Sequence, residues 1–391
     1  MMHVIKDAVH GNIRVSDAEL MVIDTPEMQK LRGIKQMAVA YLVYPGANHT
    51  RFEHSLGTMH ITGRICENLS LSEDETKNMR AAALLHDVGH TAFSHESEGI
   101  LVRKRMGNHE QRGVETLTKG GSGEILEDNG YDLKRICALI GGDEKGGIIN
   151  FDLGSDRMDY LLRDSHYTGV AYGVIDWDRL VHTIRLKGGR AVLEWGGIEA
   201  AESLLIARFL MFSSVYYHHA VRIASAMLGR AVELALEDGD VTTAEITDCN
   251  DAELGFALRK GERSGRLIER VERRKLFKRA YELELNRLNR RGRELFRNYW
   301  SIKKVEDEIR EKSGIEDIIL ECRQGYDEKF GESSVHILKG SREYPLERLS
   351  EIVGAIRKTE EMRMRAIVAC PKEQRKRVGL VCERFFRQFV G

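Results

Sequence analysis

The 391-residue sequence contains very little proline and no long apolar run. Its four prolines leave almost every segment free to form long helices, which argues against a mainly β protein. No apolar stretch approaches the roughly 18 residues of a membrane span, and the beginning MMHVIKDAVHG is not that of a signal peptide. We therefore predict a cytoplasmic location and expect no membrane partner.

Closely spaced cysteines and a net charge are also lacking. The six cysteines include no CxxC pair, so neither a disulfide framework nor a zinc ribbon is predicted. Lysine and arginine (60 residues) balance aspartate and glutamate (61), which argues against a protein whose whole surface binds polyanions. With 42% apolar residues, the chain can bury a sizeable core, and its length suggests two or three packed units.

The spacing of apolar residues predicts a mainly α-helical protein. Within residues 3–23, short β-branched runs split by a turn at 10–12 predict a short N-terminal β-hairpin. Helical periodicity dominates from residue 27 to about 117, and further helices are predicted at 156–164 and 204–236. Residues 259–312 include 19 basic and 10 acidic side chains, which indicates solvated helical faces or, alternatively, an anion-binding or oligomer-contact surface. The predicted units are a core over 1–250, a basic helical extension over 251–312, and a small α/β subdomain over 313–391.

Histidines and aspartates are spaced in a way that predicts a metal site. His54 is followed by the adjacent pair His86 and Asp87, and then by Asp156. Neighbouring residues of a helix lie about 100° apart, so the pair could reach one ion between helices, with the other two completing the ligand set. These ligand types suit Mn²⁺, Fe²⁺, Ni²⁺, Zn²⁺ or Mg²⁺. An ion with open positions lowers the pKa of bound water and favours hydrolysis.

More titratable residues follow the His-Asp pair. His90 comes one turn after His86, and His95, Glu98 and His109 are close by in the sequence. Burying so many ionisable groups on otherwise apolar helices is costly unless a charged partner is present. A metal ion with a phosphate ligand would be such a partner, and the cluster therefore indicates a functional site.

At this point the sequence resembles the HD-domain deoxynucleoside triphosphate triphosphohydrolases. The resemblance rests mainly on the motifs RFEHSLG (51–57), LLHDVGH (84–90) and DRMDY (156–160), and it covers roughly residues 4–222. It implies an HD-domain helical core over residues 1–250.

The resemblance also implies roles for individual residues. The metal ligands would be His54, His86, Asp87 and Asp156. The catalytic residues would be His90, His95, Glu98 and His109. Substrate contacts are implied for phosphates (Arg51, Arg157 and Arg208), for the sugar 3′-hydroxyl (Gln36 and Asp164) and for the sugar ring (Tyr160 and Tyr216).

The implied reaction is metal-dependent hydrolysis at the α-phosphate, which releases a nucleoside and triphosphate. We expect His95, oriented by Glu98, to protonate the leaving oxygen, with His109 as the second candidate. Phe212 and Tyr217 replace polar residues that the animal members of this family place around the base and phosphates. The base preference therefore stays open. The alternatives are hydrolysis of a ribonucleoside triphosphate or nucleoside monophosphate, or a non-catalytic sensor of nucleotides or nucleic acid.

Partners follow from the same resemblance. It implies a nucleotide substrate and a homo-oligomer. Asp24, Gln29 and Arg32 match residues that bind an activating guanine nucleotide, although structural salt bridges would also explain them. The basic residues 259–312 are the only support for a nucleic-acid partner.

Three residues also have simpler interpretations. Arg51 could form a structural salt bridge with Glu53, or with a helix end, instead of contacting phosphate. His49 is expected to be a loop residue, and His60 a helix-surface residue.

Overall fold

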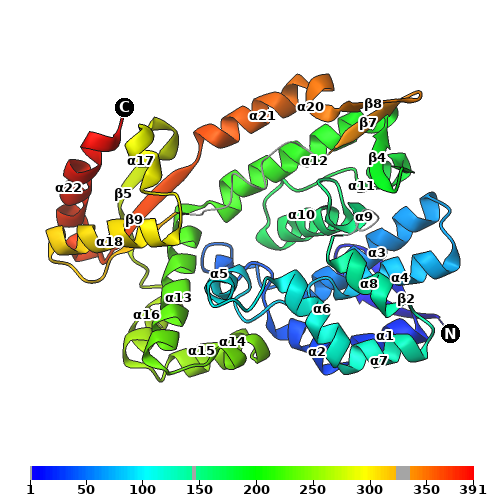
Figure 1. Ribbon diagram of the computed structural model, residues 1–391, viewed down its shortest axis with the longest axis horizontal. Coiled ribbons are helices and arrows are strands. Elements are labelled where there is room, and N and C mark those ends of the chain that lie inside the picture. Colours follow the sequence, from blue (N-terminus) through cyan, green and yellow to red (C-terminus); the bar gives the residue numbers. More distant parts are fainter. Residues whose placement is uncertain (1, 143–146, 323–334) are drawn as a thin grey trace.

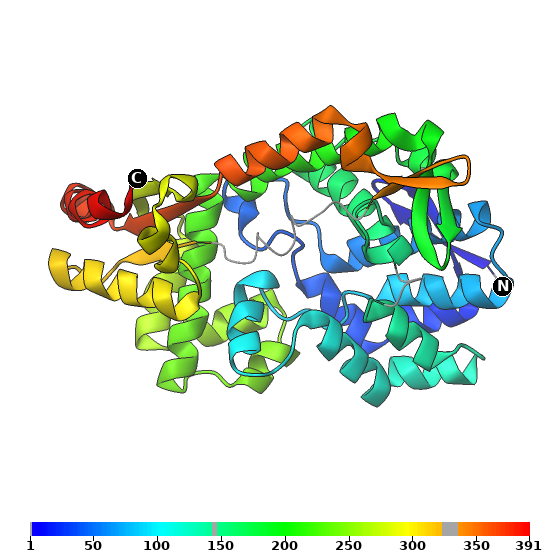
Figure 2. The same cartoon turned by 45° about the horizontal axis from the view of Figure 1, so that its top comes forward.

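The computed structural model of the chain describes residues 2–142, 147–322 and 335–391, and most of them are helical (Figures 1 and 2). This confirms the predicted fold class. The chain begins with an antiparallel hairpin of β1 (Met2–Asp7) and β2 (Gly11–Ser16), as predicted. Ile13 and Val15 are buried on one face of β2, as the period of two requires.

The hairpin leads into the helices that carry the histidine and aspartate motifs. These are α1 (Asp17–Ile23), α2 (Pro26–Lys30), α3 (Arg51–Asn68), α4 (Glu73–Leu85), α5 (His95–Arg103), α6 (His109–Lys119), α7 (Gly121–Asp128), α8 (Leu133–Ile140), α9 (Gly147–Asn150) and α10 (Ser155–Thr168). Helix α3 packs against both α4 and α10. Its first turn is fixed by a capping box in which Thr50 and Glu53 satisfy each other's backbone amides.

The second half of the chain mixes helices with short strands. Its helices are α11 (Trp177–Thr183), α12 (Ile198–Met211), α13 (His219–Asp238), α14 (Thr243–Asp248), α15 (Asp251–Leu258), α16 (Glu262–Glu272), α17 (Arg290–Glu294), α18 (Tyr299–Ser313), α20 (Leu346–Leu349), α21 (Glu351–Met362) and α22 (Arg375–Phe386). The helix predicted over 204–236 is interrupted by a π-helical turn, η5 (Phe212–Tyr216). Periodicity could not predict this turn because the apolar pattern continues through it.

Two small sheets join distant segments of this second half. The first has the order β3 (Ile184–Lys187), β4 (Arg190–Glu194), β7 (His336–Lys339) and β8 (Arg342–Pro345). The second places β9 (Arg365–Cys370) between β5 (Lys278–Glu284) and β6 (Ile319–Glu321). Strand β5 lies in the segment that was interpreted as helical, and it pairs across the predicted boundary at 312. The three-unit division stays a prediction.

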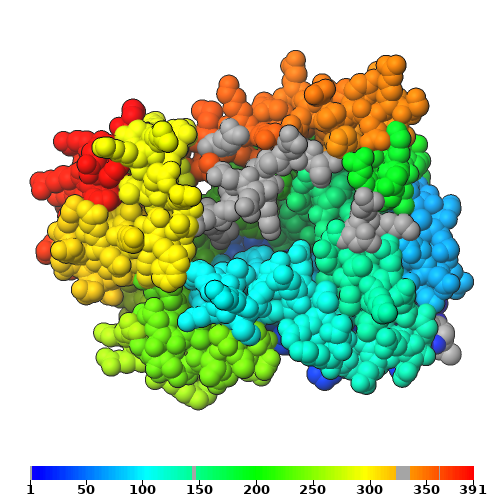
Figure 3. All heavy atoms as spheres, in the orientation of Figure 1, coloured from blue at the N-terminus to red at the C-terminus, as the bar shows by residue number. Residues whose placement is uncertain are grey.

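The buried apolar residues form separate clusters around these elements. The largest joins the hairpin, α3, α4, α10 and α12, and a second surrounds α13, α15 and α16. In Figure 3 the cyan segment, which includes α5, forms part of the front surface, and the orange segment, which includes α21, lies along the top. Among the described residues, no helix has both the length and the apolar character needed to cross a bilayer.

Candidate active site

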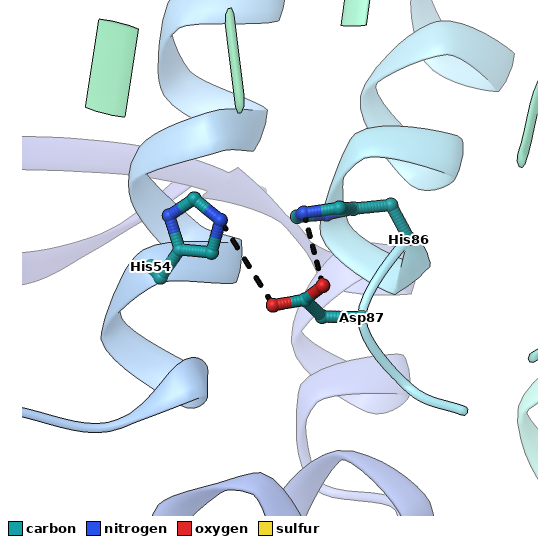
Figure 4. Close-up of side chains that lie close together, drawn as sticks. All are labelled: His54, His86 and Asp87. Carbon is teal, nitrogen blue, oxygen red and sulfur yellow. Dashed lines mark ion pairs between the residues drawn. The ribbon is translucent and has the colours of Figure 1, made fainter. Parts of the chain in front are cut away.

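Three of the predicted metal ligands converge between α3 and the end of α4 (Figure 4). One ligand atom from each of His54, His86 and Asp87 lies within 4.8 Å of the others. Asp156 on α10 is the fourth neighbour, with its Oδ1 3.0 Å from His54 Nε2 and 3.8 Å from His86 Nε2. The prediction that Asp87 lies on a helix is wrong, since α4 ends at Leu85 and Asp87 occupies the following turn.

Hydrogen bonds at the far side of each imidazole fix which nitrogen faces the cluster. His54 Nδ1 donates to Asp159 Oδ2 at 2.8 Å, and His86 Nδ1 donates to the carbonyl of Ala83 at 2.8 Å. Both Nε2 atoms therefore point toward the carboxylates. His86 Nε2 is buried and has no hydrogen-bond partner among the described residues. Two imidazoles and two carboxylates, with one nitrogen left unsatisfied, fit a divalent metal ion.

The charges at the cluster are tightly coupled. Burial would raise the pKa of Asp87, but Arg51, His86 and His90 hold that pKa well below its usual value. Burial alone would lower the pKa of His54, yet its bonds to Asp156 and Asp159 raise that pKa to about 10. In the metal-free protein, His54 is therefore a cation near neutral pH.

We expect metal binding to displace the proton on His54. A metal ligand must be neutral imidazole, so the apparent affinity for Mn²⁺ should rise with pH up to about 10, where His54 loses its proton unaided. Titration calorimetry near pH 7.5, in buffers of different ionisation enthalpy, should show release of about one proton per ion. Binding heats that do not depend on the buffer would contradict this expectation.

A buried ionic network supports His54 from behind. Asp159 binds His54, accepts from His10 of the N-terminal hairpin at 2.6 Å, and pairs with Arg163. Arg163 is fully buried and also pairs with Asp7 of the hairpin. The sequence analysis named none of these as supporting residues. The spacing of Asp159 and Arg163, four positions apart on α10, was a signal for this network. Residues with that spacing lie on one face of a helix, which here is the face toward the hairpin.

Gly57 shows how closely α3 and α10 approach each other at this network. A Cβ atom at position 57 would lie 1.8 Å from Asp159 Oδ1 and 2.4 Å from Arg163 Nη2. Only glycine leaves room for the carboxylate to reach His54, which explains the glycine at the end of the RFEHSLG motif.

The residues predicted to be catalytic lie together beside the metal cluster. Glu98 binds His95 Nδ1 at 3.1 Å and His109 Nδ1 at 2.7 Å. The rings of His90 and His109 are stacked, with centroids 4.1 Å apart, and His90 Nε2 lies 3.3 Å from Asp87 Oδ1. Stacked rings cannot both direct an in-plane lone pair at one ion, so this group suits phosphate contact and proton transfer better than a second metal. Which histidine is the acid stays a prediction.

Protonation differs among these groups. Burial, and then the charge of Arg51, lowers the pKa of His90 well below its usual value, so His90 is neutral near pH 7. Burial raises the pKa of Glu98, but its bonds to His109 and His95 outweigh burial and lower it, which keeps the carboxylate ionised. The ionised Glu98 can orient either histidine as a proton donor.

Arg51 contacts the metal cluster directly. Its Nη1 donates to Asp87 Oδ2 at 2.6 Å, and its Nε donates to Ser94 Oγ at 2.7 Å. The suggested salt bridge with Glu53 is wrong, because Glu53 instead accepts the backbone amide of Thr50. Contact with a helix end is present, since Ser94 is the N-cap of α5. Arg51 therefore connects the metal cluster to the turn that precedes α5.

The predicted sugar-binding residues form a second group. Asp164 Oδ1 lies 2.7 Å from His49 Nε2, and its Oδ2 accepts the hydroxyl of Tyr216. His49 is a loop residue, as predicted, but it is 2% exposed and stacks on Tyr167, so it belongs to the buried site. Gln36 Oε1 is buried without a hydrogen-bond partner among the described residues and is available to a ligand.

Two of the predicted phosphate-binding arginines, Arg157 and Arg208, lie within electrostatic reach of Tyr160. Burial raises the pKa of the Tyr160 phenol, which lies within electrostatic reach of Arg157, Arg208, Asp156 and Asp164. Arg157 also pairs with Asp152, which the sequence analysis did not identify. The individual roles of the predicted substrate residues stay predictions.

Other expected residues make contacts within the chain. Arg32 donates to Gln29 at 2.9 Å and lies over the ring of Phe52. The guanine-nucleotide activator and the homo-oligomer stay predictions. His60 is half-buried against the rings of His10 and Trp177, so its assignment to the helix surface is wrong.

Sequence comparisons match two regions of the chain. A model of the HD domain matches residues 51–164, and a model described as an HD associated region matches residues 175–388. An uncharacterised protein of Methanocaldococcus jannaschii is 36% identical over 381 residues, which cover 96% of this chain and 80% of that protein. The deoxynucleoside triphosphate triphosphohydrolase SAMHD1 homolog of Dictyostelium discoideum is 30% identical over 262 residues, covering 60% of this chain. The chain spans only 48% of that protein's length.

Solved structures share the fold over nearly the whole chain. A hypothetical protein of Aquifex aeolicus has a TM-score of 0.81 and 30% identity, covering 98% of this chain and all of that one. A phosphohydrolase of Bacteroides thetaiotaomicron has a TM-score of 0.74 and 24% identity, covering 95% of this chain and all of that one.

Proposed function

The chain belongs to the HD-domain phosphohydrolases that carry an HD-associated region, and we propose that it hydrolyses deoxynucleoside triphosphates at the α-phosphate. The products would be a nucleoside and triphosphate. The observation that carries the proposal is the arrangement of α10. This helix carries Asp156 beside the metal cluster. One and two turns later, on the same face, it carries Tyr160 and Asp164, which are predicted to contact the sugar.

The phosphate end of the substrate would lie among the metal ligands and the basic side chains. Arg157 and Arg208, with Arg51, would neutralise the charge of the triphosphate. When bound, a divalent ion held by the two imidazoles and two carboxylates would polarise the scissile phosphate and supply an activated water. His95 or His109, held by Glu98, would donate a proton to the departing 5′-oxygen.

The sugar end would lie against Asp164 and Tyr216. Both carboxylate oxygens of Asp164 are already oriented, one by His49 and the other by Tyr216, so an incoming hydroxyl would meet a fixed acceptor. Burial, followed by the charge of Asp164, raises the pKa of Tyr216 well above its usual value. The phenol therefore stays neutral as a hydrogen-bond donor.

A pocket beyond Tyr216 is suited to a nucleobase. The ring centroids of Phe212 and Tyr216 lie 4.8 Å apart, and Phe212 also lines an open pocket with Phe209 and Tyr217. Aromatic side chains of this kind stack on bases. The pocket supports a nucleoside substrate over a small phosphate ester.

Product analysis tests the proposal. The purified protein would be incubated with each dNTP and NTP, with Mn²⁺ or Mg²⁺, and with or without GTP. We expect nucleoside and intact triphosphate from dNTPs, with loss of both products in His86→Ala and full activity in a control variant at the exposed His182 on α11.

The other outcomes distinguish the alternatives. Equal turnover of NTPs would show that the residues predicted to contact the sugar do not select deoxyribose. Release of orthophosphate alone would assign the protein to another phosphate ester. Binding of nucleotide without any product, under all these conditions, would favour the sensor and contradict the proposal.

A further inference from the structure

One carboxylate outside the HD domain contacts two of the backbone segments that deliver side chains to the candidate active site. Asp251 is the first residue of α15, in the HD-associated region. Its Oδ2 accepts the backbone amide of Lys35 at 3.0 Å, and its Oδ1 accepts the backbone amide of Phe93 at 2.7 Å. These two amides are far apart in the sequence.

The carboxylate of Asp251 is not needed to cap its own helix. Asn250 performs that role, because its Oδ1 accepts the amides of Ala252 and Glu253, and Glu253 accepts the amide of Asn250 in return. Both oxygens of Asp251 are instead used by other segments. Burial raises the pKa of this carboxyl, and the hydrogen bonds from the two amides act in the opposite direction by stabilising the carboxylate.

The first segment that Asp251 holds supports Gln36, His49 and Arg51. Residues 34–36 run beside residues 49–51, where the amide of Arg51 donates to Ile34 at 2.9 Å and the amide of Gln36 donates to His49 at 3.1 Å. The amide of Lys35 points the other way, toward Asp251. Fixing Lys35 therefore fixes the strand-like pair on which these site residues lie.

The second segment is a strained turn. Phe93 and Ser94 have φ angles of 60° and 50°, in the left-handed region that non-glycine residues rarely adopt. Such a turn persists only where its surroundings hold it. Asp251 binds the amide at its first strained residue, and Leu254 of α15 belongs to the same apolar cluster as the Phe93 ring.

The strained turn leads directly to catalytic groups. Ser94 Oγ accepts Nε of Arg51, whose Nη1 binds the metal-cluster residue Asp87. His95 follows as the first residue of α5. Asp251 thus supports Arg51 from two directions, through the backbone of the 34–36 segment and through Ser94.

We propose that Asp251 is a positioning residue, which clamps the 34–36 segment and the 93–94 turn and thereby sets the placement of Arg51 and His95. The expected effect on kcat/KM rests on the proposed function, whereas the expected effect on the order of the two segments does not. The clamp makes the HD-associated region part of the catalytic machinery, because α15 fixes groups that belong to the HD domain.

Asp251→Asn tests the clamp with little change in shape. The amide has one acceptor where the carboxylate has two, so one backbone N–H loses its partner and faces a donor. Hydrogen exchange of peptides covering 31–36 and 91–96 should become faster, and kcat/KM should fall about 10- to 100-fold. Glu253→Gln is the matched control, because it removes the same charge from the same helical turn without touching either segment. It should leave both measurements unchanged.

A double-mutant cycle tests the route through Ser94. If Asp251 acts on Arg51 through this hydroxyl, Asp251→Asn and Ser94→Ala should lower kcat/KM less together than the product of their separate effects. Independent effects would overturn this route. Asp251→Glu keeps the charge but displaces the oxygens, so it should give intermediate exchange and intermediate kcat/KM, and it carries the test if Asp251→Asn does not fold.

Unchanged hydrogen exchange at both segments in folded Asp251→Asn would overturn the proposal. So would a lower melting temperature with unchanged kinetics, since that result would give Asp251 a stabilising role alone. If the wild-type protein hydrolyses no nucleotide, the proposed function fails, and the exchange measurement still decides whether the clamp exists.

Discussion

Asp87→Asn is expected to lower the rate of the proposed dNTP hydrolysis by about 10⁴-fold, because it removes a predicted charged ligand worth several kcal/mol to the transition state. Asp87 lies next to both His86 and His90 and also binds Arg51. The asparagine keeps the shape but cannot offer two anionic oxygens. Measurement of kcat/KM together with metal content per chain should show that both are lost.

The control for Asp87→Asn must lose a buried ion pair elsewhere. Glu19 is 4% exposed and pairs with Arg80 at 2.7 Å, and no contact joins this pair to the metal cluster among the described residues. Glu19→Gln should lower the melting temperature while metal content and kcat/KM stay at wild-type values. Full metal content and activity in Asp87→Asn would rule out Asp87 as a ligand.

Asp159→Asn is expected to weaken Mn²⁺ binding about 10- to 100-fold, although Asp159 is not itself one of the predicted ligands. Its Oδ2 holds the Nδ1–H of His54, which directs the other nitrogen toward the cluster. The substitution also leaves Arg163 with Asp7 alone in a fully buried site, which should cost about 3–5 kcal/mol of unfolding free energy. Competition titration with a metal-binding dye and chemical denaturation measure the two effects.

His10→Gln separates the metal effect from the loss of stability. The His10 side chain binds the opposite oxygen of Asp159, so this variant perturbs the same carboxylate while leaving its pairing with Arg163 intact. We expect a smaller loss of stability and a smaller loss of metal affinity, and excess Mn²⁺ should restore activity in both variants. An unchanged Mn²⁺ affinity in Asp159→Asn would show that His54 does not depend on this support.

The local parts of the fold and site could be predicted from the sequence. The β-branched runs on either side of the turn at 10–12 predicted the hairpin, and the helix predicted at 156–164 corresponds to α10. The histidine and aspartate types at 54, 86, 87 and 156 predicted a metal site, because few other roles justify burying such groups together. Each of these features is visible within a short window of residues or from side-chain chemistry alone.

The remaining features depend on contacts between distant segments. His49 and Asp164 are separated by 115 positions, and Phe93 and Asp251 by 158. No local pattern indicates such a contact, because the sequence around a polar loop residue is the same whether its side chain bonds to solvent or to a buried carboxylate. Strand β5 was missed for a related reason, since its pairing with β9 outweighed the helical propensity of a charged segment.

The position of β9 at the centre of its sheet has a consequence for the order of folding. Its two neighbours, β5 and β6, are both synthesised earlier and can pair only when β9 has left the ribosome. Helix α21, which precedes β9 and packs along α12, is also added late. A nascent chain that already contains every metal ligand therefore still lacks these late partners. Such non-local pairing slows folding. Until β9 is available, β5 and β6 keep unpaired strand edges, which chaperones can bind.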